Sequence, residues 1–85
     1  MSVEVIVYAT RFCPYCMMAR RLLNKKGIEF TEISVSGNTE LWDEMEQKSG
    51  RNTVPQIFIN GESVGGYDDI AALDRQGELD IKLGI

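Results

Sequence analysis

Two cysteines, Cys13 and Cys16, lie three positions apart near the start of a chain of 85 residues that contains no histidine. Such a pair could form a structural disulfide, part of a metal site or a redox-active centre. A disulfide between them would close a very short loop, so the loop-entropy model predicts little stabilisation of the fold. A tetrahedral zinc site needs four ligands, and one pair of cysteines without histidine supplies only half of them. Two chains, or added small thiols, could still complete a metal site.

The spacing favours a redox-active pair. Positions i and i+3 share one helix face, so a disulfide there can form and break without large backbone movement. Pro14 suits the first position of a helix, which places Cys13 among the free N–H groups of the helix start, where negative charge is favoured. Pro14 has no N–H, so the N–H groups of Tyr15 and Cys16 are candidate donors to the sulfur, and Arg11 adds positive charge nearby. These interactions favour a nucleophilic thiolate at Cys13, whereas Cys16, expected to be less exposed, would resolve a mixed disulfide formed there.

The elements that must position this pair are short and alternate along the chain. Strands are expected over residues 3–9, 30–35, 55–60 and 62–64, and helices over 15–26, 39–48 and 70–76, followed by a short helical tail. The dipeptide Asn60-Gly61 predicts a hairpin, and Asp68 or Asp69 is expected to cap the third helix. The order β-α-β-α-β-β-α predicts an α/β fold over residues 1–85, a single domain with a small mixed four-stranded sheet and helices on both faces. Cys13 then lies at the carboxyl end of the first strand, where open α/β sheets place their sites.

Charge and hydropathy bear on location and partners. The net charge is -4, with a balance of +4 over residues 1–26 and -8 over the remainder, so the cysteines lie in the basic part. The acidic total argues against nucleic acid as a partner. No apolar run approaches the roughly 18 residues of a membrane helix. The apolar run at 3–9 contains Glu4 and follows no basic residue, so it is not expected to be a signal peptide. A cytoplasmic location is therefore expected, because thiols stay reduced there.

Three motifs, CPYC (13–16), TVP (53–55) and GGYDD (65–69), together resemble the dithiol bacterial glutaredoxins over nearly the whole chain. The resemblance implies a thioredoxin fold and a glutathione-dependent thiol–disulfide oxidoreductase acting through Cys13 and Cys16. Its substrates would be disulfide-containing or glutathionylated proteins. Glutathione would be a co-substrate, with no cofactor bound permanently and no metal. A separate NADPH-dependent glutathione reductase would supply the electrons, and a monomer is expected.

The second motif, TVP, places a proline at the first residue of a strand, where the missing N–H does least harm. It also predicts a cis peptide bond between Val54 and Pro55, since cis bonds are largely confined to proline. Such a bond would turn the backbone N–H and C=O of Val54 toward an extended, peptide-like substrate. By resemblance, Thr53, Val54 and Pro55 lie beside the reactive sulfur.

The third motif, GGYDD, combines a turn with an acidic helix start. A helix N-terminus can hold a carboxylate and an aspartate can hold an ammonium, which together match the amino-acid end of a γ-glutamyl group. By resemblance, that end of glutathione is bound by Asp68 and Asp69, with Gly66 and Tyr67 adjoining.

Basic and aromatic residues are expected to complete the glutathione site. Arg51 and Arg11 would meet the glycine-end carboxylate, and Tyr15 would form an aromatic wall. Two positions depart from the family pattern: Thr10 stands where many members have lysine, and Tyr67 stands where a small residue is frequent. Met17, Met18 and Trp42 have spacing typical of core packing, and no function is predicted for them.

Two alternatives remain open on the sequence. One is a redoxin that a thioredoxin reductase reduces. The other is an iron–sulfur cluster held with glutathione between two chains, which is less favoured because cluster-binding relatives resemble a monothiol pattern with glycine after the first cysteine.

Overall fold

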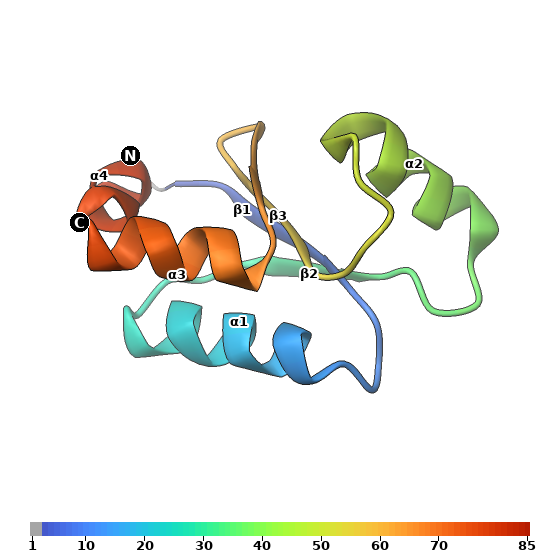
Figure 1. The fold of residues 1–85 in the computed structure, drawn as a ribbon, viewed down its shortest axis with the longest axis horizontal. Helices are drawn as coiled ribbons and strands as arrows, with labels where there is room; N and C mark the ends of the chain where they lie inside the picture. The colour runs from blue at the N-terminus through green and yellow to red at the C-terminus, as the bar shows by residue number, and fades with distance from the viewer. Residues whose placement is uncertain (1–2) are drawn as a thin grey trace.

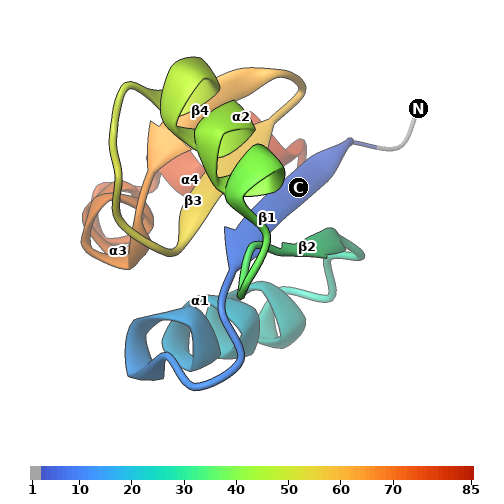
Figure 2. The same ribbon diagram turned by 90° about the vertical axis from the view of Figure 1, so that its right-hand side faces the viewer.

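The computed structural model describes residues 3–85, which form four strands and four helices (Figures 1 and 2). The elements are β1 (Val5–Ala9), α1 (Pro14–Lys25), β2 (Thr31–Ser34), α2 (Thr39–Ser49), β3 (Gln56–Ile59), β4 (Glu62–Gly65), α3 (Tyr67–Arg75) and α4 (Glu78–Leu83). This is the predicted element order, and the helical tail is α4. None of the helices described over 3–85 is long and apolar enough to cross a membrane.

The four strands form one mixed sheet in the order β2-β1-β3-β4. Strand β1 pairs parallel with β2 and antiparallel with β3, and β3 pairs antiparallel with β4. The β3–β4 turn has positive φ at both central residues, 51° at Asn60 and 82° at Gly61, as a two-residue hairpin turn requires. The predicted hairpin and the mixed four-stranded sheet are therefore confirmed.

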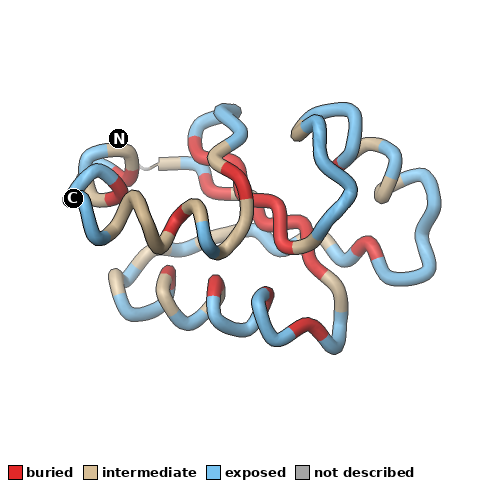
Figure 3. The backbone as a smooth tube through the Cα atoms, in the orientation of Figure 1, coloured by how far each residue is buried: buried red, intermediate tan, exposed pale blue. Residues whose placement is uncertain are grey.

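Helices cover both faces of the sheet, and each face has its own apolar core (Figure 3). On one face, alternate residues of β1 and β3 pack against α1, α3 and α4, with Cys16, Leu23 and Ile70 fully buried. On the other face, Tyr8, Phe58 and Met45 of α2 form a second cluster. Because the period of a strand is two, β1 contributes side chains to both cores and is buried along most of its length.

Two predictions about the helices are wrong. The third helix begins at Tyr67 and its N-cap is Gly66, so neither Asp68 nor Asp69 is the capping residue. Asp69 instead stands at the third helical position, where its carboxylate accepts a hydrogen bond from the Gly66 N–H.

The second correction concerns α1. Met17 and Met18 are not core residues, since their side chains are 53% and 41% exposed. The helix turns Cys16, Ala19 and Leu23 toward the sheet instead, and these three residues leave the two methionines on the outer side.

Candidate active site

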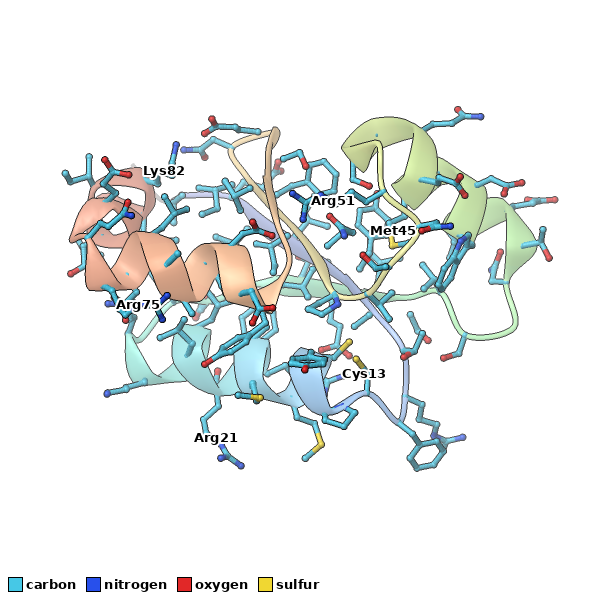
Figure 4. The ribbon with its side chains drawn as sticks, viewed as in Figure 1. Cys13, Arg21, Met45, Arg51, Arg75 and Lys82 are labelled. Atoms are coloured by element: carbon cyan, nitrogen blue, oxygen red, sulfur yellow. The ribbon has the colours of Figure 1, made fainter. Side chains whose placement is uncertain are left out.

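The first cysteine caps the helix that carries the second. Cys13 is the N-cap of α1, with extended backbone (φ -129°, ψ 110°), and Pro14 occupies the first helical turn without leaving an N–H unpaired. The Cys16 N–H donates to Cys13 Sγ over 3.2 Å, so Cys16 supplies the donor that the sequence had assigned to either Tyr15 or Cys16. Figure 4 shows Cys13 at the start of α1, with its side chain directed toward the loop before β3. A donated N–H and a position at a helix start are both arrangements that suit a thiolate nucleophile.

The two thiols occupy unequal environments. Both are free, and Cys16 is completely buried whereas Cys13 retains 8% exposure. Burial, reinforced by the hydrogen bond with Cys13, raises the pKa of the Cys16 thiol to about 11. Arg20, one turn further along α1, opposes that rise with its charge, while its guanidinium is paired with Glu32. Cys16 is therefore a protonated thiol near neutral pH and Cys13 is the sulfur that a substrate can reach.

The loop between α2 and β3 faces Cys13. The Val54–Pro55 peptide bond is cis, as predicted. The carbonyl oxygen of Val54 lies 3.9 Å from Cys13 Sγ, within range of a weak S–H···O contact. The TVP segment thus borders Cys13 Sγ, the sulfur beside which the resemblance places it.

A buried glutamine, Gln56, holds this loop in place and was not singled out in the sequence. Its Nε2 donates to the carbonyl oxygen of Thr53 over 3.0 Å and to Thr53 Oγ1 over 3.1 Å. A carbonyl oxygen only accepts, so the NH₂ end of the amide must face Thr53. Gln56 is 1% exposed, and its Oε1 accepts no hydrogen bond from residues 3–85. Two hydrogen bonds from one fully buried residue therefore fix an exposed residue of the loop. The only sequence signal was a polar residue in an otherwise apolar strand.

The start of α3 completes the site. Asp69 Oδ2 accepts from the Gly66 N–H over 2.9 Å and from Arg51 Nη1 over 2.8 Å. The Gly66 hydrogen bond, and then the Arg51 guanidinium, hold the pKa of Asp69 below its usual value. Arg51, which lies on the loop after α2 (Figure 4), thereby ties that loop to α3.

The two glycines of GGYDD allow this close approach. A Cβ at Gly65, where φ is 93°, would lie 2.3 Å from Asp69 Oδ2. A Cβ at Gly66 would lie 3.1 Å from the carbonyl oxygen of Pro55. A side chain at Gly66 would therefore press on the TVP loop, whereas one at Gly65 would displace the Asp69 carboxylate and would also need a positive φ.

Four of the residues implied for glutathione binding, Val54, Gly66, Asp69 and Arg51, form one continuous track that begins at Cys13. Contacts run from Cys13 to Val54 and Pro55, then through Gly66 to Asp69 and Arg51.

Four further predicted residues lie outside these contacts. Tyr15 and Asp68 are exposed, and Tyr67 is half-buried against the core on the α1 side. The guanidinium of Arg11 lies over the Phe12 ring, 5.8 Å from its centroid, and the Arg11 N–H donates to Ser36 Oγ.

Cys13 caps a helix, a buried partner thiol follows one turn later, and a cis-proline loop lies beside them. On a sheet of this topology, these features define a thiol–disulfide oxidoreductase of the thioredoxin fold. The glutaredoxin family model matches residues 5–64. Glutaredoxin 3 of Escherichia coli strain K12 is 49% identical over 77 residues, which cover 91% of this chain and 93% of that protein. The chain belongs to the glutaredoxin family, and the predicted activity, a glutathione-dependent thiol–disulfide oxidoreductase, is confirmed.

Solved structures agree with this assignment. The solution structure of glutaredoxin from Brucella melitensis is 52% identical and superposes with a TM-score of 0.85, covering 96% of this chain and 89% of that chain. The crystal structure of a buckwheat glutaredoxin–glutathione complex is 26% identical with a TM-score of 0.87, covering 94% of this chain and 76% of that chain. The predicted thioredoxin fold is therefore confirmed.

Proposed function

We propose that Cys13 is the nucleophile and Cys16 the resolving thiol of this oxidoreductase. The observation that carries the proposal is the Cys16 N–H directed at Cys13 Sγ, combined with complete burial of the Cys16 side chain. On a glutathionylated protein, the Cys13 thiolate attacks the glutathione sulfur. A Cys13–glutathione disulfide forms, the original S–S bond breaks, and the protein thiolate leaves and takes up a proton. A second glutathione thiolate then attacks the bound glutathione sulfur, which releases glutathione disulfide and restores the Cys13 thiolate.

A protein disulfide follows a second route. Cys13 attacks one sulfur of the disulfide and forms a mixed disulfide with the substrate. Cys16 then loses its proton and attacks Cys13 Sγ, which closes the Cys13–Cys16 disulfide and releases the reduced protein. Two glutathiones later reduce this disulfide and leave as glutathione disulfide. The raised pKa of Cys16 suits this order, because Cys16 stays protonated until the mixed disulfide has formed.

The glutathione site in this proposal is the track from Cys13 to Arg51. The backbone of Val54 pairs with the cysteinyl part of glutathione beside the sulfur, with Thr53 and Pro55 shaping the same loop. The γ-glutamyl carboxylate meets the N–H groups at the start of α3, near Gly66 and Tyr67, and its ammonium meets Asp68 and Asp69.

Arg51 changes partner when glutathione binds. Its pairing with Asp69 occupies the carboxylate that is to receive the ammonium. The incoming ammonium replaces the guanidinium, and the released Arg51 then turns to the glycine-end carboxylate. This exchange costs little because ion pairs between exposed groups contribute at most about 1 kcal/mol. Arg11 and Tyr15 border the same site from the α1 side.

The wider context is proposed on the same basis. Electrons come from NADPH through a separate glutathione reductase, and glutathione is a co-substrate rather than a resident cofactor. The protein acts as a cytoplasmic monomer, in a compartment whose thiols remain reduced.

The choice of reductant is tested by a comparison of two coupled assays. Wild type, Asp68→Ala and Asp69→Ala are assayed with glutathione and glutathione reductase, and then with thioredoxin reductase in their place. We expect turnover with glutathione only, and a rise in the KM for glutathione in both variants. Turnover with thioredoxin reductase that is unaffected by both substitutions would instead assign the protein to the thioredoxin-reductase-dependent redoxins.

A further inference from the structure

The exposed apolar side chains of this protein gather beside the reactive cysteine. Among residues 3–85, the large apolar residues left exposed are Phe12 at 89%, Tyr15 at 55%, Met17 at 53%, Met18 at 41%, and Ile81 and Ile85 at the other end of the chain. Four of these six thus fall within seven consecutive residues that include Cys13 and Cys16. Single exposed apolar residues are ordinary, but a cluster at a reactive centre marks an interaction surface.

The other long helix shows what a solvated face looks like in this molecule. The exposed positions of α2 are all polar, with Glu40, Asp43, Glu46 and Gln47 among them. The exposed face of α1 presents Met17 and Met18 instead. Methionine is flexible and polarisable, which suits a surface that must fit partners of varied shape.

Positive charge surrounds the cluster. Helix α1 contains no acidic residue. Arg20 is paired with Glu32, but neither Arg11 nor Arg21 forms an ion pair within residues 3–85. Figure 4 shows Arg21 on the outer side of α1, pointing away from the sheet. Arg11 lies over Phe12. The surface therefore offers apolar contact between two unpaired guanidinium groups, although the protein as a whole is acidic.

We propose that Phe12, Met17, Met18 and Arg21 form a docking patch for the polypeptide that flanks a substrate disulfide, and that this flanking segment is acidic and apolar. The proposal rests on the proposed function, in which Cys13 attacks such a disulfide. Acidic side chains of the segment pair with Arg21 and steer its approach, while apolar side chains cover the methionines. The proposed glutathione track runs from Cys13 to the TVP loop and the start of α3, so glutathione and small mixed disulfides do not need Met17, Met18 or Arg21 of this patch. The patch thus selects among protein substrates without affecting turnover of small ones.

The test uses two peptides with the same internal disulfide, flanked by alternating aspartate and leucine or by alternating lysine and leucine. The full chain is assayed as wild type, as Arg21→Glu, and as the matched control Arg75→Glu, which has the same change in charge at an exposed site on α3. We expect wild type to prefer the aspartate peptide by about tenfold in kcat/KM at low salt, with the preference falling as salt rises. Arg21→Glu should remove most of that preference and Arg75→Glu should leave it within about twofold.

The apolar part of the patch is tested in the same way. Met17→Gln with Met18→Gln should raise the KM for the aspartate peptide, whereas Ile81→Gln with Ile85→Gln, also two apolar-to-polar changes at exposed sites, should not. Turnover of a small glutathione mixed disulfide should stay unchanged in every variant. Wild-type turnover of that small disulfide also tests the proposed function separately from the patch.

Peptide binding to the patch can also be measured without turnover. Affinity for the two peptides, with serine in place of their cysteines, is measured by fluorescence anisotropy. Equal affinity for both peptides, or equal effects of Arg21→Glu and Arg75→Glu, would overturn the proposal. Binding to vesicles of anionic phospholipid that Arg21→Glu abolishes, without any preference between the peptides, would also overturn it and assign the patch to a membrane surface.

Discussion

The Gln56→Leu substitution separates the stability of the fold from the positioning of the loop before β3. The buried amide donates two hydrogen bonds to Thr53, over 3.0 and 3.1 Å, while its Oε1 accepts none from residues 3–85. Leucine removes two hydrogen bonds with a net value of about 1 kcal/mol each, and also removes a buried acceptor without a partner, which costs about 1–3 kcal/mol. These contributions nearly cancel. We therefore expect the free energy of unfolding to change by about 1 kcal/mol or less, a shift in Tm of at most about 8 °C.

The same substitution should weaken the use of glutathione. Thr53 is exposed, so water can hydrogen-bond the carbonyl and hydroxyl groups that Gln56 releases, and the core no longer fixes the loop beside Cys13. A loss of about 1 kcal/mol in binding corresponds to a rise of about fivefold in the KM for glutathione. Urea unfolding measures the first effect and a coupled assay with varied glutathione measures the second.

Gln47→Leu, a glutamine replaced at an exposed position of α2, is the matched control and should change neither quantity. If Gln56→Leu lowered the free energy of unfolding by more than about 3 kcal/mol, the fold would need the amide, and the unpaired Oε1 would not destabilise the protein. An unchanged KM for glutathione in a stable Gln56→Leu protein would refute the positioning role.

Three further substitutions test the start of α3 and the second thiol. Gly65→Ala should destabilise the fold by about 1–3 kcal/mol by thermal unfolding, because φ is 93° and the new Cβ would meet Asp69 Oδ2; wild-type stability would contradict the close approach. Asp69→Asn should lower stability near neutral pH. Because the folded-state pKa of Asp69 is lowered, the stability difference between wild type and Asp69→Asn should be present above the ordinary pKa of 3.8. It should vanish as the pH falls through the folded-state pKa; a stability difference that does not change with pH would exclude charge as the cause. In Cys13→Ser, burial still raises the pKa of the Cys16 thiol, so its alkylation, followed by mass spectrometry, should be slow at neutral pH and accelerate as the pH rises; rapid modification at neutral pH would contradict its burial.

The fold was predictable because its signals are local. Three signals restrict the backbone directly: the apolar run that becomes β1, Pro14 at the start of α1 and the hairpin dipeptide Asn60-Gly61. The inequality of Cys13 and Cys16 followed from the same kind of signal, since the helix start and the spacing fixed which thiol would cap the helix.

The partners of individual side chains were not predictable, because tertiary packing sets them. Helical spacing shows which residues share a face but not which face meets the sheet, so Met17 and Met18 were assigned to the core. Arg51 and Asp69 are 18 residues apart and were assigned to opposite ends of glutathione, yet they form an ion pair. The role of Gln56 depends on how the chain turns before β3, which no pattern along the strand reveals.

Turnover by the two cysteine variants tests the central claim most directly. Wild type, Cys13→Ser and Cys16→Ser are assayed with glutathione and glutathione reductase on a small glutathione mixed disulfide and on a protein disulfide. We expect Cys13→Ser to be inactive on both substrates, and Cys16→Ser to reduce the mixed disulfide while losing reduction of the protein disulfide. Activity of Cys13→Ser on either substrate, or loss of both activities in Cys16→Ser, would contradict the assignment of nucleophile and resolving thiol.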